Sequence, residues 1–520
     1  MSITSFYFLC FYAVLLLLYY ILPRRSQWVL LLAGSILFFV LSGDPVLLVY
    51  PAAGVTVTYL CARFMYRRSR DGNGTPVYVR ASVKRCRTAL VIAVLSDVGF
   101  LFALKYVNFF INTVNGICLF TGHAAAAGNV SFLVPLGISY YSLSLISYVT
   151  DVYFETAAMQ ANPFKLALYG MYFPAMVSGP IMRYRTDGEQ FFVPHEFDYA
   201  RVTRGMQRMI WGFMQKLVIS ERLGRVVDTV YGSYTSYPGA YIWLGTACFA
   251  FQLYTDFAGC MDIVLGISET FGLTLPENFD RPFFSQTVAE YWRRWHISLG
   301  VWMKEYVFYP LLRSGLFTKQ AGRLRARFGR KAGKQLNTFL AMLILWFTVG
   351  IWHGGDWKYV IGSGLLHWCY IVVGEIADPR FRRLWKKLGI DPDIWWLRSL
   401  RIIRTFFLVN IGFVFFRGRS VADAWDMLKL GVSVWNPGVL CGSGMLGLGL
   451  EFKDIVVTAV SLGLFILVSV LKNKGSVRER IARRPLPVRW IIWYALLFYV
   501  ILLGCYGPGY SAAQFIYQGF

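Results

Sequence analysis

The chain has 520 residues, of which 56% are hydrophobic and only 15% are charged, whereas about a quarter of the residues of a soluble domain are charged. Apolar runs of nearly twenty residues recur from end to end, and a run of that length can cross a hydrocarbon core of roughly 30 Å. The composition therefore predicts an all-α polytopic membrane protein and excludes an ordinary soluble domain.

The net charge of +24 could suggest a nucleic-acid-binding protein, but the positions of the basic residues favour another interpretation. Lys and Arg gather in short loops between apolar runs, where they set the topology and meet anionic lipid headgroups. No basic-aromatic surface domain is evident that would hold nucleic acid. The nine cysteines are scattered, with no CxxC pair and no His/Cys ligand spacing, so we predict no metal site.

The first apolar run is followed by Arg24 and Arg25, with no basic segment before it and no cleavage site after it. This pattern predicts a retained helix with its N-terminus outside and its far end in the cytoplasm. The basic loop at residues 67–87 is predicted to be cytoplasmic. Counting the later runs puts the C-terminal tail, residues 507–520, outside as well.

The segment at residues 134–154, VPLGISYYSLSLISYVTDVYF, is apolar overall but dense in Ser and Tyr, and it ends near Asp151. Such hydroxyls either join packed helices or line a polar cavity, and both readings stay open. The FPAMVSGP stretch that follows breaks the helix at apparent membrane depth, which is tolerated only against protein or a water-filled cavity. Arg183, just beyond the break, is a candidate anion contact.

The run from about Tyr241 to Phe271 carries several polar residues. Gln252 and Asp256 are four residues apart and share one helical face, while Asp262 and Glu269 share another. Carboxylates in an apolar span should face the protein interior. Pairing with arginines is the favoured interpretation, and substrate binding by Gln252 and Asp256 is the alternative.

An aromatic pattern at steps of three and four predicts a helix across residues 292–309. His296 and Arg293 would lie on a different face from the aromatic one. A helix rich in Arg and Trp suits the membrane interface, so it either brings His296 to a pocket mouth or serves only as a surface anchor. The aromatic face would consist of Trp292, Trp295, Leu299, Trp302, Tyr306 and Tyr309.

Two apolar runs, residues 338–351 and residues 357 onward, lie between basic segments and predict a hairpin with its apex at WHGGDW. Gly354 and Gly355 permit close backbone approach at this apex. An ionisable side chain at the end of an apolar segment is costly unless it has a function, so His353 is the leading catalytic candidate. His367, ten residues further into the second run, is a weaker one.

Several of these segments together resemble the membrane-bound O-acyltransferase (MBOAT) family, and in particular its bacterial branch of alginate O-acetyltransferase membrane subunits. The specific matches are SGPIMRYR, QLYTDFAGCMDIVLG, ENFDRPFFSQTVAEYWRRWHISLGVW and the IWHG block. The resemblance implies a bundle of about eleven transmembrane helices, with re-entrant or interfacial helices, around a central tunnel. In that bundle residues 1–520 form one domain: N-terminal helices (1–133), a catalytic core (134–377) and C-terminal helices (378–520).

The resemblance also implies a function. It matches His353 to the catalytic histidine of the family and His296 to the second key polar position of the bacterial branch. The expected activity is O-acetylation of an extracytoplasmic polysaccharide in exopolysaccharide biosynthesis, with no bound cofactor and with acetyl-CoA or an acyl-carrier thioester as donor. An extracytoplasmic acetyltransferase-like partner would take part, and the protein would lie in the bacterial cytoplasmic (inner) membrane.

The residue types suggest how the reaction proceeds. A neutral imidazole can take a proton from an attacking hydroxyl, so His353 is the predicted general base. His296 would orient a substrate or stabilise the developing oxyanion. Further predicted substrate contacts, with donor phosphates expected at the first two, are Arg293, Arg294, Trp295 and Trp352, besides Gln252, Asp256, Arg183 and His367.

Three other functions stay open. D-Alanyl transfer to teichoic acid from a carrier protein would use the same chemistry. A transporter could use the buried carboxylates and broken helices as a substrate path, although no inverted repeat is evident. A scaffold of a polysaccharide export complex would need no catalytic histidine at all.

Overall fold

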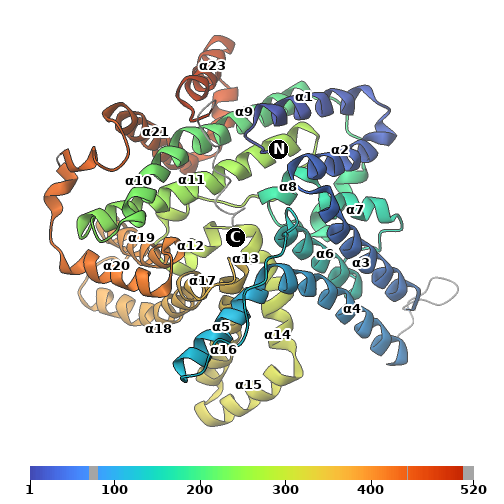
Figure 1. Cartoon of the computed structure of the whole chain (residues 1–520), viewed down its shortest axis with the longest axis horizontal. Helices are drawn as coiled ribbons and strands as arrows, with labels where there is room; N and C mark the ends of the chain where they lie inside the picture. The colour runs from blue at the N-terminus through green and yellow to red at the C-terminus, as the bar shows by residue number, and fades with distance from the viewer. Residues whose placement is uncertain (69–79, 442, 507–520) are drawn as a thin grey trace. The chain divides into compact units, whose positions relative to one another are not determined.

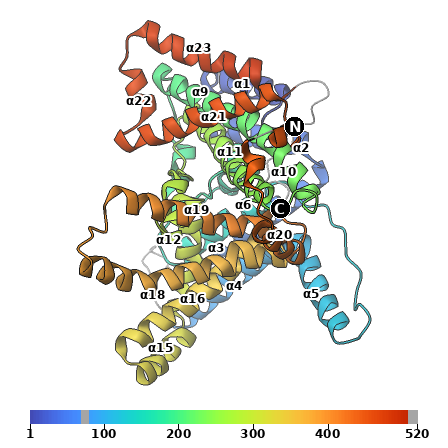
Figure 2. The ribbon, with the colours of Figure 1, turned by 90° about the vertical axis from the view of Figure 1, so that its left-hand side faces the viewer.

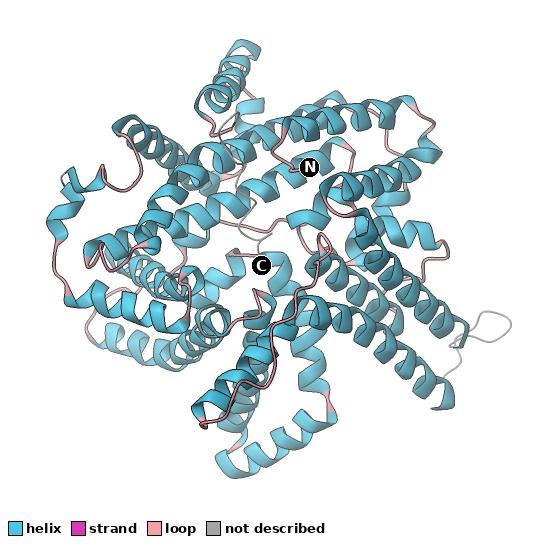
Figure 3. Cartoon of the chain, viewed as in Figure 1, coloured by secondary structure: helices cyan, strands magenta, loops and turns pink. Residues whose placement is uncertain are grey.

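The computed structural model describes residues 1–68, 80–441 and 443–506, and this part of the chain is built of helices and loops (Figure 3). Its one β-type contact is an isolated bridge between Phe279 and Trp295. Among the described residues, nine helices are long and apolar enough to cross a membrane, and Phe6–Ile21 is a shorter apolar helix. The predicted all-α polytopic membrane protein is confirmed.

Finer points of that prediction stay predictions, namely about eleven crossings, a central tunnel and the three-part division of one domain. The predicted cytoplasmic loop, residues 67–87, is shorter than predicted, because α3 (Val49–Arg68) extends into it and α4 (Arg80–Leu101) begins within it. Residues 69–79 between these helices and the predicted extracytoplasmic tail, residues 507–520, lie outside the residues that the structure describes.

The chain divides into two compact units. The first contains Met1–Gly212 and Cys260–Pro276, and Figure 1 labels its longer helices. They are α1 (Phe6–Ile21), α2 (Gln27–Ser42), α3 (Val49–Arg68), α4 (Arg80–Leu101), α5 (Val107–Phe120), α6 (Ile138–Tyr153), α7 (Pro163–Met171), α8 (Phe173–Ser178) and α9 (Tyr199–Phe213).

Helix α6 corresponds to the segment rich in Ser and Tyr. It packs against α3 and α4, and all its residues from Ile138 to Val149 are buried. Asp151, only 3% exposed, lies 3.9 Å from the Arg185 guanidinium. The burial favours the packed-helix reading of this segment over the polar cavity.

The second unit contains Phe213–Gly259 and the described chain from Glu277 onward, and helix α11 contributes residues to both units. The main helices of the second unit are α10 (Glu221–Gly232), the first part of α11 (Ala240–Thr270), α12 (Val288–Arg294), α13 (Ile297–Met303), α15 (Gly315–Phe328), α16 (Arg330–Trp352), α18 (Leu366–Lys387), α19 (Trp395–Arg417), α20 (Val421–Ser433), α21 (Phe452–Leu471) and α23 (Leu486–Leu503).

Helix α15 folds back against the basic N-terminal part of α16 (Figure 2). The contact is close because position 333 is a glycine: a Cβ on Gly333 would lie 2.6 Å from backbone atoms of Arg325. Two helices rich in positive charge are thereby held together at one end of α16.

The predicted hairpin is confirmed at the other end of α16. Helix α16 ends at Trp352, and the short helix α17 (Trp357–Tyr359) begins after the apex and continues through a π-helical segment, η9 (Val360–Leu365), into α18. The close approach predicted for the apex glycines is also present, because a Cβ on Gly354 would lie 2.3 Å from the Tyr359 ring.

Glycines allow the two arms of this hairpin to pack tightly. A Cβ on Gly350 of α16 would lie 2.6 Å from the Val360 Cα. Likewise, a Cβ on Gly364 of η9 would lie 2.6 Å from the Trp346 carbonyl oxygen. Small residues at a crossing let two backbones approach in this way, and the apex with His353 therefore rests on a crossing that leaves no room for a methyl group.

We expect Gly350→Ala to destabilise the protein by about 1–3 kcal/mol, because the added methyl forces the two backbones apart. The matched control is Gly374→Ala in α18, where no atom lies within 4 Å of an added Cβ. Thermal unfolding in detergent compares the two variants. A Gly350→Ala protein as stable as the Gly374→Ala protein would show that the crossing is looser than described.

Candidate active site

His296 lies in a break between two short helices. Helix α12 ends at Arg294 and α13 begins at Ile297, so the predicted single helix across residues 292–309 is wrong. His296 itself has a left-handed backbone, with φ of 46°, which is uncommon for a residue other than glycine. Trp295 is buried as well, so this piece is not a simple surface anchor.

A distant segment causes the break. The Ile297 amide donates to the Asn278 carbonyl oxygen (3.0 Å), and the Asp280 amide donates to the Arg294 carbonyl oxygen (2.9 Å). These contacts use backbone groups that a continuous helix would pair internally. The chain is therefore held extended around Trp295 and turns sharply at His296.

The His296 side chain is only 1% exposed and is surrounded by aromatic rings. Its ring centre lies 4.9 Å from that of Phe257 and 5.5 Å from that of Trp352. Burial, and then the charge on nearby His353, hold the pKa of His296 well below its usual range. The imidazole is consequently neutral near pH 7.

His353 follows the last residue of α16, at the predicted apex, and is 2% exposed. Its ring centre lies 5.3 Å from that of Trp352 and 5.8 Å from that of Phe416 in α19. Trp352 thus contacts both histidines. Two imidazoles that are 57 residues apart in sequence meet around one indole ring, inside the second unit.

His367 does not share these contacts. It lies in α18, 2% exposed, with its ring centre 5.1 Å from that of Trp292 and 6.1 Å from that of Trp346. Trp292 belongs to α12, the helix that leads into His296. His367 therefore packs against α12 through Trp292. A direct role of His367 in substrate binding stays a prediction.

The other candidates near His296 differ from one another. Arg293 is exposed, whereas the Arg294 guanidinium pairs with Glu290 at 2.6 Å. Trp295 packs against Tyr291, with nearly parallel rings 5.5 Å apart. Trp295 therefore packs the core, and contacts of Arg293 and Arg294 with the acyl donor stay predictions.

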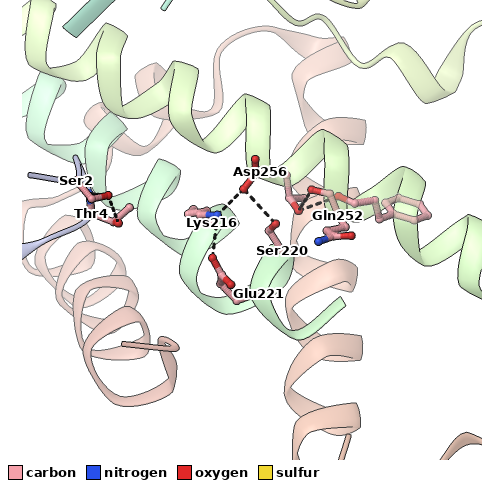
Figure 4. A network of polar contacts seen from close by, with 9 residues as sticks. Ser2, Thr4, Lys216, Ser220, Glu221, Gln252 and Asp256 are labelled. Atoms are coloured by element: carbon pink, nitrogen blue, oxygen red, sulfur yellow. Dashed lines mark hydrogen bonds and ion pairs between the residues drawn. The ribbon is translucent and has the colours of Figure 1, made fainter. Parts of the chain in front are cut away.

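Asp256 has a lysine partner in the protein interior. The Lys216 ammonium lies 2.6 Å from the Asp256 carboxylate and 2.8 Å from that of Glu221, and the Ser220 hydroxyl donates to Asp256 at 3.4 Å (Figure 4). Lys216 belongs to a π-helical segment, η6 (Met214–Ser220), which continues into α10. Because Lys216, Glu221 and Asp256 are all less than 10% exposed, this network ties α10 to α11 in the interior.

Gln252, one turn from Asp256 along α11 (Figure 4), packs against Gly224 of α10, where an added Cβ would lie 2.9 Å from its amide nitrogen. Substrate roles for Gln252 and Asp256 stay predictions. In the second carboxylate pair, Asp262 does have the predicted arginine partner, Arg208, at 2.9 Å.

Arg183 belongs to the first unit, where its backbone amide donates to Asp187 at 2.8 Å. Its role as an anion contact stays a prediction. No group of three or more His, Cys, Asp or Glu side chains that could hold a metal ion occurs among the described residues.

Two residues of this region escaped the sequence analysis. Asn278 accepts from the Ser298 amide at 3.0 Å and lies 3.2 Å from His296 Nδ1, and Phe257 packs its ring against His296. Both lie far from His296 in sequence. The ENFD stretch that contains Asn278 belongs to one of the motifs that resemble the family. That resemblance was the one feature of the sequence that could have pointed to Asn278.

Comparison with known proteins identifies the family of this chain. Residues 55–323 match the model of the MBOAT, membrane-bound O-acyltransferase, family, a range that includes His296. The probable alginate O-acetylase AlgI of Pseudomonas aeruginosa is 30% identical over 420 residues, or 81% of this chain and 72% of the relative. A continuous match of that length necessarily includes both His296 and His353.

More distant relatives act on other polymers. The peptidoglycan O-acetyltransferase of Helicobacter pylori is 27% identical to this chain, in an alignment that covers 66% of this chain and 64% of the relative. The teichoic acid D-alanyltransferase of Bacillus subtilis is 28% identical and covers 55% and 69%, respectively. Because the family model matches more than half of the chain and the alginate O-acetylase relative is 30% identical over most of it, this chain belongs to the membrane-bound O-acyltransferase family and is an acyltransferase.

Proposed function

We propose that this protein transfers an acetyl group from a cytoplasmic thioester to a hydroxyl of an extracytoplasmic polysaccharide, with His353 as general base. The observation that carries the proposal is the meeting of His296 and His353 around Trp352. Two buried imidazoles are costly in an apolar interior, and acyl transfer to a hydroxyl gives them a use.

The proposed reaction needs one proton acceptor at the hydroxyl. His353 takes the hydroxyl proton while the oxygen attacks the thioester carbonyl, so that an O–C bond forms and the C–S bond breaks. The proton then passes to the departing thiolate. General base catalysis of this kind typically contributes about 10²–10⁴-fold to the rate.

The charge along α16 supports the proposed direction of transfer. Lys334 and His353 are nineteen residues apart, or about 28 Å at 1.5 Å per residue, which is close to the thickness of a hydrocarbon core. Basic residues favour the cytoplasmic side, so His353 would lie near the opposite face. Between Arg313 and Lys334 there is no acidic residue, and eight basic side chains are exposed: Arg313, Lys319, Arg323, Arg325, Arg327, Arg330, Lys331 and Lys334.

We expect a cysteine at Thr318, on the exposed surface of α15, to resist a membrane-impermeant maleimide in intact cells and to react once the membrane is opened. The loop at residues 121–129 follows the apolar run after the predicted cytoplasmic loop and is therefore expected to face outward, so a cysteine at its exposed Ala125 should react in intact cells. Labelling of the unsubstituted protein measures the background from its native exposed cysteines. Labelling of the Thr318→Cys protein in intact cells would contradict the proposed orientation.

The choice of donor and acceptor is tested in proteoliposomes that carry the protein, a polysaccharide acceptor and an extracytoplasmic acetyltransferase-like partner. Label should pass from acetyl-CoA to the polysaccharide. Because the relatives include a teichoic acid D-alanyltransferase, a second arm supplies D-alanyl carrier protein, and transfer in that arm alone would favour D-alanylation. If neither donor is consumed although the same protein restores polymer export in cells, the chain is a transporter or scaffold.

A further inference from the structure

The amide of Asn278 is orientated by a donor that cannot change its role. Asn278 is 1% exposed, and its side-chain oxygen lies 3.0 Å from the backbone nitrogen of Ser298. A backbone N–H only donates, so the atom that faces it must be the amide oxygen and not the amide nitrogen. The Ser298 hydroxyl donates to the same oxygen at 3.0 Å.

This assignment determines where the hydrogen of His296 lies. The same Asn278 oxygen is 3.2 Å from His296 Nδ1, and an amide oxygen only accepts hydrogen bonds. Nδ1 must therefore carry a hydrogen and donate it. In a neutral imidazole with a hydrogen on Nδ1, the other nitrogen, Nε2, has a lone pair and no hydrogen.

We infer that Asn278 is a positioning residue that holds neutral His296 in the Nδ1–H tautomer, so that Nε2 accepts a hydrogen bond from an O–H or N–H group of the substrate. The break at Trp295 supports this role, because the backbone around Asn278 also holds residues 294–297 in register. The hydrogen on Nδ1 rests on the geometry and the neutral state of the ring rests on its burial, whereas its use in acyl transfer rests on the proposed function.

In this tautomer His296 positions a substrate and does not stabilise the oxyanion. A neutral imidazole with no hydrogen on Nε2 cannot donate to the oxyanion of a thioester under attack, which was one of the roles expected from the sequence. The Nε2 lone pair can instead accept a hydrogen bond from the hydroxyl of the acyl acceptor or from an amide N–H of the acyl donor. Either bond would hold that substrate in line with the reacting carbonyl. Positioning of this kind lowers the barrier by ordering the reactants before the reaction.

The direct test is nitrogen-15 NMR of the full-length protein labelled at histidine in nanodiscs, with the His296 signals assigned by their loss in His296→Gln. We expect the wild type to carry the hydrogen on Nδ1. The Asn278→Ala protein should lose this preference, and the control Ser298→Ala should keep it, because the Ser298 backbone amide and the Asn278 oxygen both remain. A hydrogen on Nε2 in the wild type would overturn the inference.

A kinetic test uses Asn278→Asp, which keeps the size and the accepting oxygen. A carboxylate beside the imidazole favours its protonated form and should raise the pKa of His296 in the variant. The acid side of the rate–pH profile should then move to higher pH, while Asn278→Ala should lower the rate without that move. An unchanged profile in Asn278→Asp would also overturn the inference.

The two tests keep the inference separate from the proposed function. If no thioester is consumed by any variant, the proposed function fails, and the NMR measurement still decides the tautomer. If the wild type turns over acetyl-CoA but carries its His296 hydrogen on Nε2, the inference fails and the proposed function stands.

Discussion

Replacing His353 with alanine is expected to lower polysaccharide acylation by about 10²–10⁴-fold, the contribution that a positioned general base makes. The imidazole is buried at the hairpin apex beside Trp352, so no solvent group replaces it readily. Acyl content of the polymer from cells that carry the variant in place of the wild-type chain measures the effect.

The matched control is His123→Ala, which removes an exposed loop histidine and should leave acylation unchanged. Both proteins should appear in the membrane in equal amounts and elute as single peaks in detergent, because alanine at the apex removes contacts but no packing glycine. Normal acylation in the His353→Ala cells would exclude this histidine as the base.

Removing the Lys216 ammonium is expected to destabilise the protein by about 3–5 kcal/mol, the cost of leaving buried charges uncompensated. In Lys216→Met the carboxylates of Asp256 and Glu221, 1% and 8% exposed, would lose the cation between them. The unfolding transition in detergent should move to lower temperature.

The control for that variant is Lys429→Ala, which breaks a surface pair with Asp426 whose side chains are 60% and 52% exposed. Surface pairs contribute only about 0–1 kcal/mol, so this variant should unfold almost as the wild type does. Equal stability of the Lys216→Met and Lys429→Ala proteins would contradict the account of a buried network. Adding Asp256→Asn to Lys216→Met should recover part of the loss, because one uncompensated carboxylate is removed.

The hairpin with His353 was predictable because its signals are local. Two apolar runs, a pair of glycines and basic flanking segments lie next to one another in the sequence, and each constrains the same turn. Periodicity along a run reports a helix reliably when the helix is long, and α16 has 23 residues. The apex therefore falls where the sequence predicts it.

The surroundings of His296 were not predictable in the same way. The aromatic spacing across residues 292–309 fits a continuous helix equally well, and the backbone hydrogen bonds that break it involve Asn278 and Asp280, which precede His296 in a separate segment of the chain. The partner of Asp256 is forty residues away in η6, in a stretch where no pattern distinguishes Lys216 from the nearby arginines. Contacts over such separations depend on the fold, which periodicity does not encode.

The most direct test of the central claim is thiol release from labelled acetyl-CoA by the purified wild-type protein in nanodiscs, beside the His353→Ala variant. Histidine-dependent acyl transfer predicts that the wild type releases CoA and passes its label to a hydroxyl acceptor, and that the variant releases none above background. Equal release by both proteins would contradict the account, because the thioester would then be consumed without the buried histidine.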